Sequence, residues 1–168
     1  DIRRMLTQVG TGPFFGRMQK LSQGQTIEEI TRASVLLAGR RVGAIFVLQR
    51  DVGLNEYIEG GTRLDAAITK ELLLSVFLPA SPLHDGAVII HQGRLVAAGC
   101  LLPLTTNPNV SKTLGTRHRA AIGLTEETDA VVIVVSEEEG KISLVREGRI
   151  TRDVDAGVLR TTLQQLVA

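Results

Sequence analysis

The sequence is short of several residue types, and each shortage excludes a class of protein. Cysteine occurs once, at Cys100, so no disulfide can form within the chain, which is typical of a protein in a reducing cytosol. Aromatic residues make up 3% of the 168 residues and tryptophan is absent, so the core must consist of aliphatic side chains. No window reaches the roughly 18 consecutive apolar residues of a membrane span, and no signal peptide is visible.

Common nucleotide-binding and catalytic motifs are also missing. The chain has no Walker A loop, no G-x-G-x-x-G, no Cys-x-x-Cys and no G-x-S-x-G. Its formal net charge is +1, whereas general nucleic-acid binders carry a basic surplus, so nucleic acid is not an expected partner. A phosphate site in this chain therefore cannot rest on a common NTPase loop.

What remains is the composition of one globular domain, with 43% apolar and 22% charged residues. Residues 25–168 are interpreted as that domain. Residues 1–24 are interpreted as a membrane-proximal helical linker, because Arg3, Arg4, Arg17 and Lys20 suit an anionic membrane surface. The alternative for these charges is an ordinary solvated helix face. Because the chain does not begin with Met, we expect it to be an excised piece of a longer protein.

Hydrophobic patterning predicts a mixture of helices and strands. Thr26-Ile27-Glu28-Glu29 has the form of a capping box and predicts a helix start, and Thr69 and Thr116 are predicted to cap two further helices. The predicted helices cover 26–39, 70–77, 116–126 and 156–167, and the predicted strands cover 42–48, 87–91, 94–101, 130–135, 141–146 and 149–152. Crossovers mixed with hairpins predict a mixed sheet with helices around it.

The first segment with functional character is Ser81-Pro82-Leu83-His84-Asp85-Gly86-Ala87, between a helix end and a buried strand. His84 and Asp85 offer an imidazole nitrogen and a hard carboxylate oxygen, which together suit a divalent metal. Gly86 lets the backbone turn tightly or approach a ligand. The alternative is a plain turn, since Asp-Gly is a common turn pair.

The second such segment is Gly115-Thr116-Arg117-His118-Arg119, with three potential cations in the first turn of a helix. Cations are disfavoured at the positive end of the helix dipole, so their presence indicates an anion to be bound. Free amides and guanidinium groups together form a phosphate site. The alternative is an exposed basic turn tolerated at low cost. A weaker candidate is the acidic turn 136–140, which follows a strand rich in valine and is by default a surface turn.

These segments resemble a known pair of motifs. Asp85-Gly86-Ala87 and Arg117-His118-Arg119, in this order and at this separation, are similar to the two hallmarks of the diadenylate cyclase domain. The similarity runs from about Leu21 to the C-terminus and includes 41–45, 82–89, 114–121 and 135–138. The chain is closest in character to the membrane-anchored housekeeping class, in which three transmembrane helices precede a basic helix.

The resemblance implies a fold and a reaction. The fold is α/β, one domain with a mixed, mostly antiparallel, barrel-like sheet surrounded by helices. The reaction joins two ATP molecules into cyclic di-AMP with release of two pyrophosphates. Residues 25–168 would form the catalytic domain on the cytoplasmic side of the cell membrane. The partners implied are an activator with YbbR repeats and phosphoglucosamine mutase.

The resemblance also implies roles for individual residues. The implied catalytic residues are Asp85, Arg117, His118 and Arg119. The implied nucleotide-binding residues are Gly43, Ala44, Asp85, Gly86, Leu101, Leu102, Thr116, Arg117, Ser136 and Glu138. The implied ligands of the metal, which is Mn²⁺, Mg²⁺ or Co²⁺, are His84, Asp85 and Glu138.

Two residues depart from the family pattern. Leu101 stands where relatives often carry a tyrosine that stacks on adenine, so the base would pack on an aliphatic surface without a ring face. Glu139 replaces a small residue and adds a charge near the phosphates.

A product with two equal halves predicts two sites that face each other across a two-fold axis, so we expect an active face-to-face homodimer. Three alternatives remain at this point. The first is a nucleotide-sensing module without catalysis, the second is a metal-dependent phosphohydrolase using His84 and Asp85, and the third is a structural partner-binding domain. The third leaves the cationic helix start unexplained.

Overall fold

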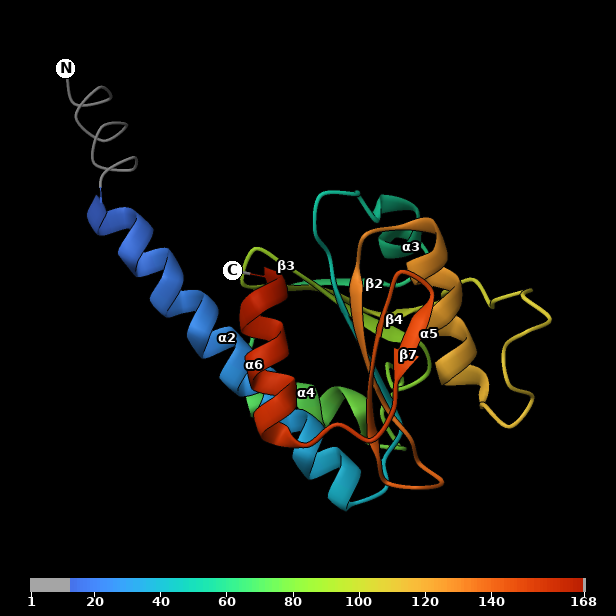
Figure 1. Cartoon of the computed structure of the whole chain (residues 1–168). Helices are drawn as coiled ribbons and strands as arrows, with labels where there is room; N and C mark the ends of the chain where they lie inside the picture. Colours follow the sequence, from blue (N-terminus) through green and yellow to red (C-terminus); the bar gives the residue numbers. More distant parts are fainter. Residues whose placement is uncertain (1–12, 168) are drawn as a thin grey trace.

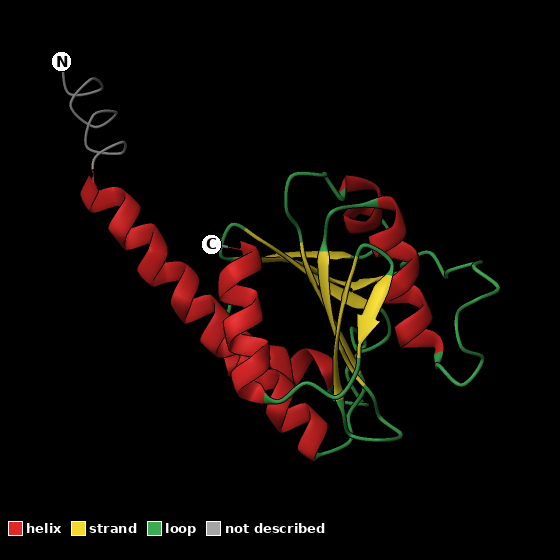
Figure 2. Ribbon diagram, in the orientation of Figure 1, coloured by secondary structure: helices red, strands yellow, loops and turns green. Residues whose placement is uncertain are grey.

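The computed structural model describes residues 13–167, and these form an α/β domain around a seven-stranded sheet (Figure 1). Helices cover both faces of the sheet, as the colouring by secondary structure makes plain (Figure 2). The strand order is β2-β4-β3-β1-β5-β6-β7. The strands are β1 Ala44–Leu48, β2 Thr62–Ala67, β3 Ala87–His91, β4 Arg94–Cys100, β5 Val131–Val135, β6 Ile142–Arg146 and β7 Arg149–Thr151.

The sheet is mixed and mostly antiparallel, as predicted. β1 and β3 run parallel, and the other five pairings are antiparallel. The expectation that the sheet resembles a barrel needs correction, because β2 and β7 remain unpaired with each other at the two edges and the sheet stays open. β2 itself was not predicted. Its run Thr62–Ala67 is largely exposed, so it lacks the apolar pattern by which a buried strand is recognised.

Two layers of helices enclose the sheet. On one face lie α2 (Pro13–Gly39), α4 (Lys70–Phe77) and α6 (Ala156–Val167), and on the other lie α3 (Asn55–Glu59) and α5 (Thr116–Glu127) (Figure 1). Alternate side chains of β1 pack on opposite faces of the sheet. Phe46 packs toward the first layer of helices, and Ile45 and Val47 pack toward the second. Burial on both faces explains why β1 and β5 are continuously apolar.

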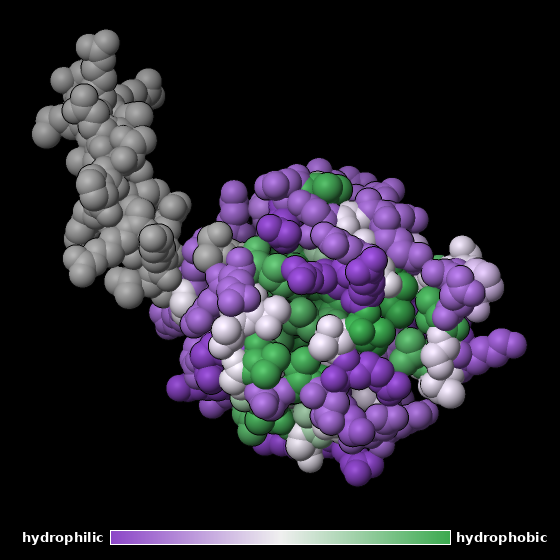
Figure 3. Space-filling model, viewed as in Figure 1, coloured by the Kyte–Doolittle hydropathy of each residue, from purple (hydrophilic) through white to green (hydrophobic). Residues whose placement is uncertain are grey.

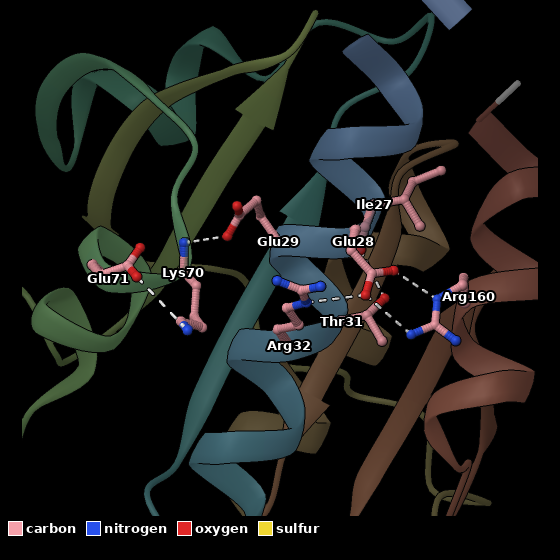
Figure 4. A network of polar contacts seen from close by, with 8 residues as sticks. All are labelled: Ile27, Glu28, Glu29, Thr31, Arg32, Lys70, Glu71 and Arg160. Atoms are coloured by element: carbon pink, nitrogen blue, oxygen red, sulfur yellow. Dashed lines mark hydrogen bonds and ion pairs between the residues drawn. The ribbon is translucent and has the colours of Figure 1, made fainter. Parts of the chain in front are cut away.

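Polar contacts join the three helices of the first layer (Figure 4). The Glu28 carboxylate of α2 accepts hydrogen bonds from Arg160 of α6 at 2.8 and 3.3 Å, and these bonds lower the pKa of Glu28. Glu29 accepts from the backbone amide of Lys70 at 2.7 Å, at the start of α4. Since Thr69 also caps that helix through the Leu72 amide, the predicted Thr69 cap is confirmed.

The predicted helix start at Thr26 is wrong. α2 runs without interruption from Pro13 to Gly39, so residues 26–29 lie inside it and the boundary expected between residues 24 and 25 falls within one helix. Ile27 and Ile30 are buried in the core, which explains the apolar helical pattern that begins at Ile27. Among the described residues, no helix has the length and apolar character needed to cross a membrane.

The surface seen in Figure 3 is polar at its rim and apolar toward its middle. The exposed large apolar side chains include Val158 on α6 and Leu101 after β4, which are 48% and 71% exposed. Leu101 matters below, because it lies at the end of the sheet where the predicted site residues meet.

Candidate active site

One end of the sheet gathers the predicted residues. Gly43 immediately precedes β1 and Gly86 precedes β3, and these two strands are parallel, so both loops lie at the same edge. β5 runs antiparallel to β1 with Val135 opposite Ala44, which brings Ser136 to this edge. β4 ends here too, because Cys100 pairs with Ala87, and Leu101 follows it. We call this side of the sheet, where the loops with Gly43, Gly86, Leu101 and Ser136 lie at the ends of the strands, the motif end.

A cavity of about 250 Å³ lies at the motif end. The start of α5 forms one wall and the turn between β5 and β6 forms another. Arg152, which follows β7, completes the lining. The full set is Thr113, Leu114, Gly115, Thr116, Arg117, His118, Ser136, Glu137, Glu138, Glu139 and Arg152. The cationic helix start and the acidic turn, separate in sequence, therefore share one cavity.

The start of α5 differs from its prediction in one respect. Gly115 is the capping residue, with extended backbone, and Thr116 is the first helical residue and makes no capping hydrogen bond. The Thr116 cap is therefore wrong. The exposed Thr116 hydroxyl stays available at the cavity, beside first-turn amides that have no partner within the helix. This arrangement suits an anion.

Arg117 crosses the motif end from α5 to β1. Its guanidinium group lies where a Cβ atom on Gly43 would be, so only glycine leaves this space free. Arg117 Nη1 also lies 3.6 Å from Glu137 Oε2 in the acidic turn. This ion pair contributes little to stability, since the Glu137 side chain is 61% exposed.

His118 and Arg119 differ from Arg117 in their surroundings. His118 is buried, and burial together with the nearby charge of Arg152 lowers its pKa, so it is neutral at neutral pH and is not the third cation that the sequence indicated. Arg119 is absent from the lining of the cavity, and its Nε donates to the Leu114 carbonyl oxygen at 3.3 Å. The Arg119 carbonyl accepts from the Thr105 amide at 3.1 Å, which fastens the loop before α5 onto the helix.

The loop with His84 and Asp85 is held in a defined shape. Nδ1 of His84 lies 2.7 Å from the Ser81 carbonyl oxygen, which can only accept, so Nδ1 is the donor, and in the neutral ring Nε2 is the nitrogen with the lone pair. Asp85 is exposed. Gly86 has φ +103°, and a side chain there would collide with the Cys100 carbonyl oxygen. The loop with His84 and Asp85 therefore lies directly against the end of β4, next to Leu101.

The turn between β5 and β6 is stabilised from several sides. The Ser136 hydroxyl accepts from the Glu139 amide at 3.2 Å, and the Glu138 carbonyl oxygen accepts from Arg41 Nη1 at 2.8 Å. The Glu138 side chain makes none of these contacts and stays exposed at the cavity. This fixes the backbone of the turn while leaving a carboxylate free to meet a ligand.

Comparison with known proteins now adds to this geometry. Residues 31–150 match the model of the DisA bacterial checkpoint controller nucleotide-binding family, abbreviated DAC. The chain belongs to the DAC family. It is 45% identical over 98% of its length to the cyclic di-AMP synthase CdaA of Bacillus subtilis, and spans 61% of that protein. The chain thus covers about three fifths of this relative.

Solved structures of DAC relatives have the same fold. A double mutant of DacA from Staphylococcus aureus superposes with a TM-score of 0.82 at 43% identity, covering 84% of this chain and 94% of that one. A hypothetical membrane spanning protein from Bacillus cereus gives a TM-score of 0.73 at 45% identity, covering 76% of this chain and 62% of that one. Both likenesses confirm the predicted family and its mixed sheet.

Within the part of the chain that the structure describes, the candidate site has no complete set of protein ligands for a metal ion. Among residues 13–167, no three His, Cys, Asp or Glu side chains lie close enough together to hold a metal ion, so His84, Asp85 and Glu138 do not form one. The donors themselves fit a hard divalent cation, since Asp85 is exposed and His84 Nε2 is free to bind. They fit a cation that takes its remaining ligands from groups other than these three side chains.

Sequence reasoning missed Arg152, the cation that completes the lining of this DAC cavity. It appeared only as the last residue of a predicted hairpin strand. The available signal was the hairpin itself, because β7 returns antiparallel to β6 and so must end at the edge where β6 begins. The five strand pairings from β4 to β7 were needed to show that β7 ends on the same side of the sheet as the predicted site residues.

Proposed function

We propose that this chain is a diadenylate cyclase domain that condenses two ATP molecules into cyclic di-AMP with release of two pyrophosphates. The observation that carries the proposal is the convergence of Asp85, Arg117 and Ser136 at one end of the sheet, in a chain of the DAC family. The name of its Bacillus subtilis relative, a cyclic di-AMP synthase, supports the same reaction.

Each end of the nucleotide has residues suited to it. Leu101, 71% exposed, and the partly buried Leu102 offer an apolar surface for adenine. By resemblance to the family, Gly43 and Ala44 would also border the base pocket. The α5 amides, Thr116 and Arg117 suit the phosphates, and so does the Ser136 hydroxyl. His118, being neutral and buried, would orient groups at the cavity by hydrogen bonding, and Arg119 would hold the loop before α5.

Asp85 is the residue suited to the reacting hydroxyl. In each half-reaction the 3′-oxygen of one ATP forms a bond to the α-phosphorus of the other, the bond to pyrophosphate breaks, and the hydroxyl proton leaves. Asp85 accepts that proton or orients the hydroxyl toward its acceptor. A divalent cation held by His84, Asp85 and Glu138 with the phosphates would neutralise charge on the phosphoryl group. In-line positioning supplies most of the remaining rate.

The symmetry of the product supports a face-to-face homodimer with one ATP in each chain. A nucleotide-bound monomer cannot deliver both attacks. The resemblance also supports a location at the cytoplasmic side of the cell membrane, with a YbbR-repeat activator and phosphoglucosamine mutase as partners. One structural relative is itself described as membrane spanning.

The test is turnover of ATP with Mn²⁺, Mg²⁺ or Co²⁺ across a wide range of protein concentration, followed by chromatography. We expect cyclic di-AMP, two pyrophosphates for each product molecule, and a specific activity that rises with protein concentration as dimers form. Release of ADP or inorganic phosphate without a dinucleotide would instead establish a phosphohydrolase. Bound ATP that never turns over, at any concentration, would establish a sensing module.

A further inference from the structure

Arg152 lies in the motif-end cavity although it belongs to neither hallmark motif. We propose that Arg152 binds the terminal phosphates of the nucleotide, and that Glu139 is the carboxylate that holds its guanidinium group until the nucleotide arrives. This inference rests on the proposed function and adds a residue that determines how many phosphates the site recognises.

The order of the strands places Arg152 at the correct end of the site. Moving across the motif end from β4 to β7, the loops present Leu101, then Asp85, then Gly43, then Ser136, and finally Arg152. Arg152 lines the same cavity as Thr116, Arg117 and Ser136. These three residues are the ones that the proposed function assigns to the phosphates, so Arg152 lies within the phosphate part of the site.

The charges of the cavity support a role for a second arginine. Its lining carries the carboxylates Glu137, Glu138 and Glu139 against the guanidinium groups of Arg117 and Arg152, and His118 is neutral. A polyanion that enters this cavity meets less repulsion when both arginines turn from their carboxylates to the phosphates. Without Arg152 the described lining would hold one guanidinium group against three acids.

The contacts of Arg152 are of the kind that a phosphate can replace. Its Nη2 meets Glu139 Oε1 at 3.3 Å in a single contact, with both side chains 44% exposed. Exposed ion pairs of this type are weak, whereas bidentate bonds from arginine to phosphate are short and strong. Glu139 is not stranded by the exchange, because Lys141 Nζ lies 3.5 Å from its other oxygen.

Arg117 and Glu137 repeat the arrangement on the other side of the same turn, at 3.6 Å. The single turn between β5 and β6 thus holds two glutamates at one cavity, and each glutamate is paired with an arginine from a different segment of the chain. Glu139 also accounts for a departure noted in the sequence, since a glutamate at this position has a cation to hold.

The competing explanation is that the Arg152–Glu139 pair only fastens β7 to the turn between β5 and β6. Binding of different nucleotides separates the two explanations. We would measure dissociation constants for ATP, ADP and AMP with Mg²⁺ by calorimetry, using Arg152→Gln, Arg152→Lys and Glu139→Gln. The matched control is Arg149→Gln, an exposed arginine at the start of the same strand.

For Arg152→Gln we expect ATP affinity to fall about tenfold and AMP affinity to stay within about twofold, because AMP lacks the terminal phosphates. Arg152→Lys should recover part of the loss, since it restores charge without the bidentate geometry. Glu139→Gln should strengthen ATP binding by about twofold to threefold, because the arginine no longer has a competing partner. Arg149→Gln should bind all three nucleotides as the unchanged protein does.

The proposal is overturned if Arg152→Gln binds ATP normally. It is equally overturned if that variant loses ATP and AMP to the same degree, because a fastening role would disturb the whole site. These readings do not depend on turnover, so they hold whether or not a dinucleotide is made. If the unchanged chain binds no adenine nucleotide at all, the proposed function itself fails, and the two failures are thereby distinguished.

Discussion

The two ends of the sheet differ in the volume of their cavities and in the residues that line them. The end opposite the motif end carries the larger cavity, about 730 Å³, against about 250 Å³ at the motif end. Its walls come from α2, from the end of β1 with Gln49 and Arg50, and from the turn between β3 and β4. None of the predicted site residues lies there. The proposed site is therefore not the larger cavity. The helix start, the glycine backbone and the opposed charges are what favour the motif end.

The motif end is unusual for an α/β sheet. In open parallel sheets ligands bind beyond the carboxyl ends of the strands. Here β1 and β3 begin at the motif end, while β4, β5 and β7 finish there, because the sheet is mixed. Asp85 and Gly43 thus reach the site from loops that lead into strands, and Leu101, Ser136 and Arg152 reach it from loops that leave them.

The largest expected effect is that of Asp85→Asn. The change removes the proton acceptor, so we expect the rate of cyclic di-AMP formation to fall at least about a thousandfold, with ATP affinity within about twofold of the unchanged protein. Product chromatography and calorimetry measure the two quantities. The matched control is Asp51→Asn, an exposed acid at the opposite cavity, which should retain full activity. Full turnover by a folded Asp85→Asn protein would refute the role given to Asp85.

A smaller effect is expected for Gly43→Ala. The new methyl group occupies the position of the Arg117 guanidinium group, which is the mobile end of a long side chain and can move away. The free energy of unfolding should therefore change by less than about 1 kcal/mol, whereas ATP affinity should fall about threefold to tenfold. Gly39→Ala, where a Cβ atom meets nothing within 4 Å, should change neither quantity much. Equal ATP affinity in Gly43→Ala and the unchanged chain would contradict the placement of Arg117.

His118, which lines the cavity at the motif end, should make the free energy of unfolding of the chain depend on pH. Burial lowers its pKa in the folded chain below the ordinary value of 6.5. The unfolded chain then binds more protons below that pH, so the free energy of unfolding falls as pH drops through 6.5 toward the lower folded value. Urea titrations between about pH 8 and about pH 5 should show a shallower loss for His118→Gln than for the unchanged chain. Parallel curves would mean that His118 is not held neutral by burial.

The smallest effect, near zero, is expected for Arg50→Gln at the opposite end. Arg50 is exposed and lines the larger cavity, far along the sheet from Arg117. ATP affinity should stay within about twofold, because a separated and solvent-exposed charge is screened by salt. A loss of ATP binding as large as that of an Arg117 variant would remove the distinction between the two ends.

Sequence reasoning was most successful where one segment carries its own signal. The strands 87–91 and 131–135 were predicted nearly to their ends, because burial on both faces gives a continuous apolar run. The helix start at Thr26 was wrong, because a capping pattern is local and packing against the sheet decides whether a helix begins there. The helix start at residue 116 was predicted correctly, and only the capping role given to Thr116 was wrong. The exposed strand β2 and the short helix α3 carry too little apolar pattern to be recognised.

The site shows the same division between local and distant information. Asp85-Gly86 and Arg117 could be named from sequence, since their types and spacing resemble the DAC motifs. Their roles as catalytic, nucleotide-binding or metal-binding residues remain predictions. That His118 is neutral, that Arg119 bonds to backbone, and that Arg152 joins the cavity depended on contacts between distant segments.

The sequence by itself determined the family, the aliphatic core and the two polar segments, because each is written in residues close together along the chain. Only the tertiary structure decided which charges meet. The register of a mixed sheet brings loops from five separate places in the sequence to the motif end. The guanidinium groups of Arg117 and Arg152 each pair there with a carboxylate that is close in space but distant in sequence. Burial, which sets whether a histidine is charged, is likewise a property of the packed chain and not of any single segment.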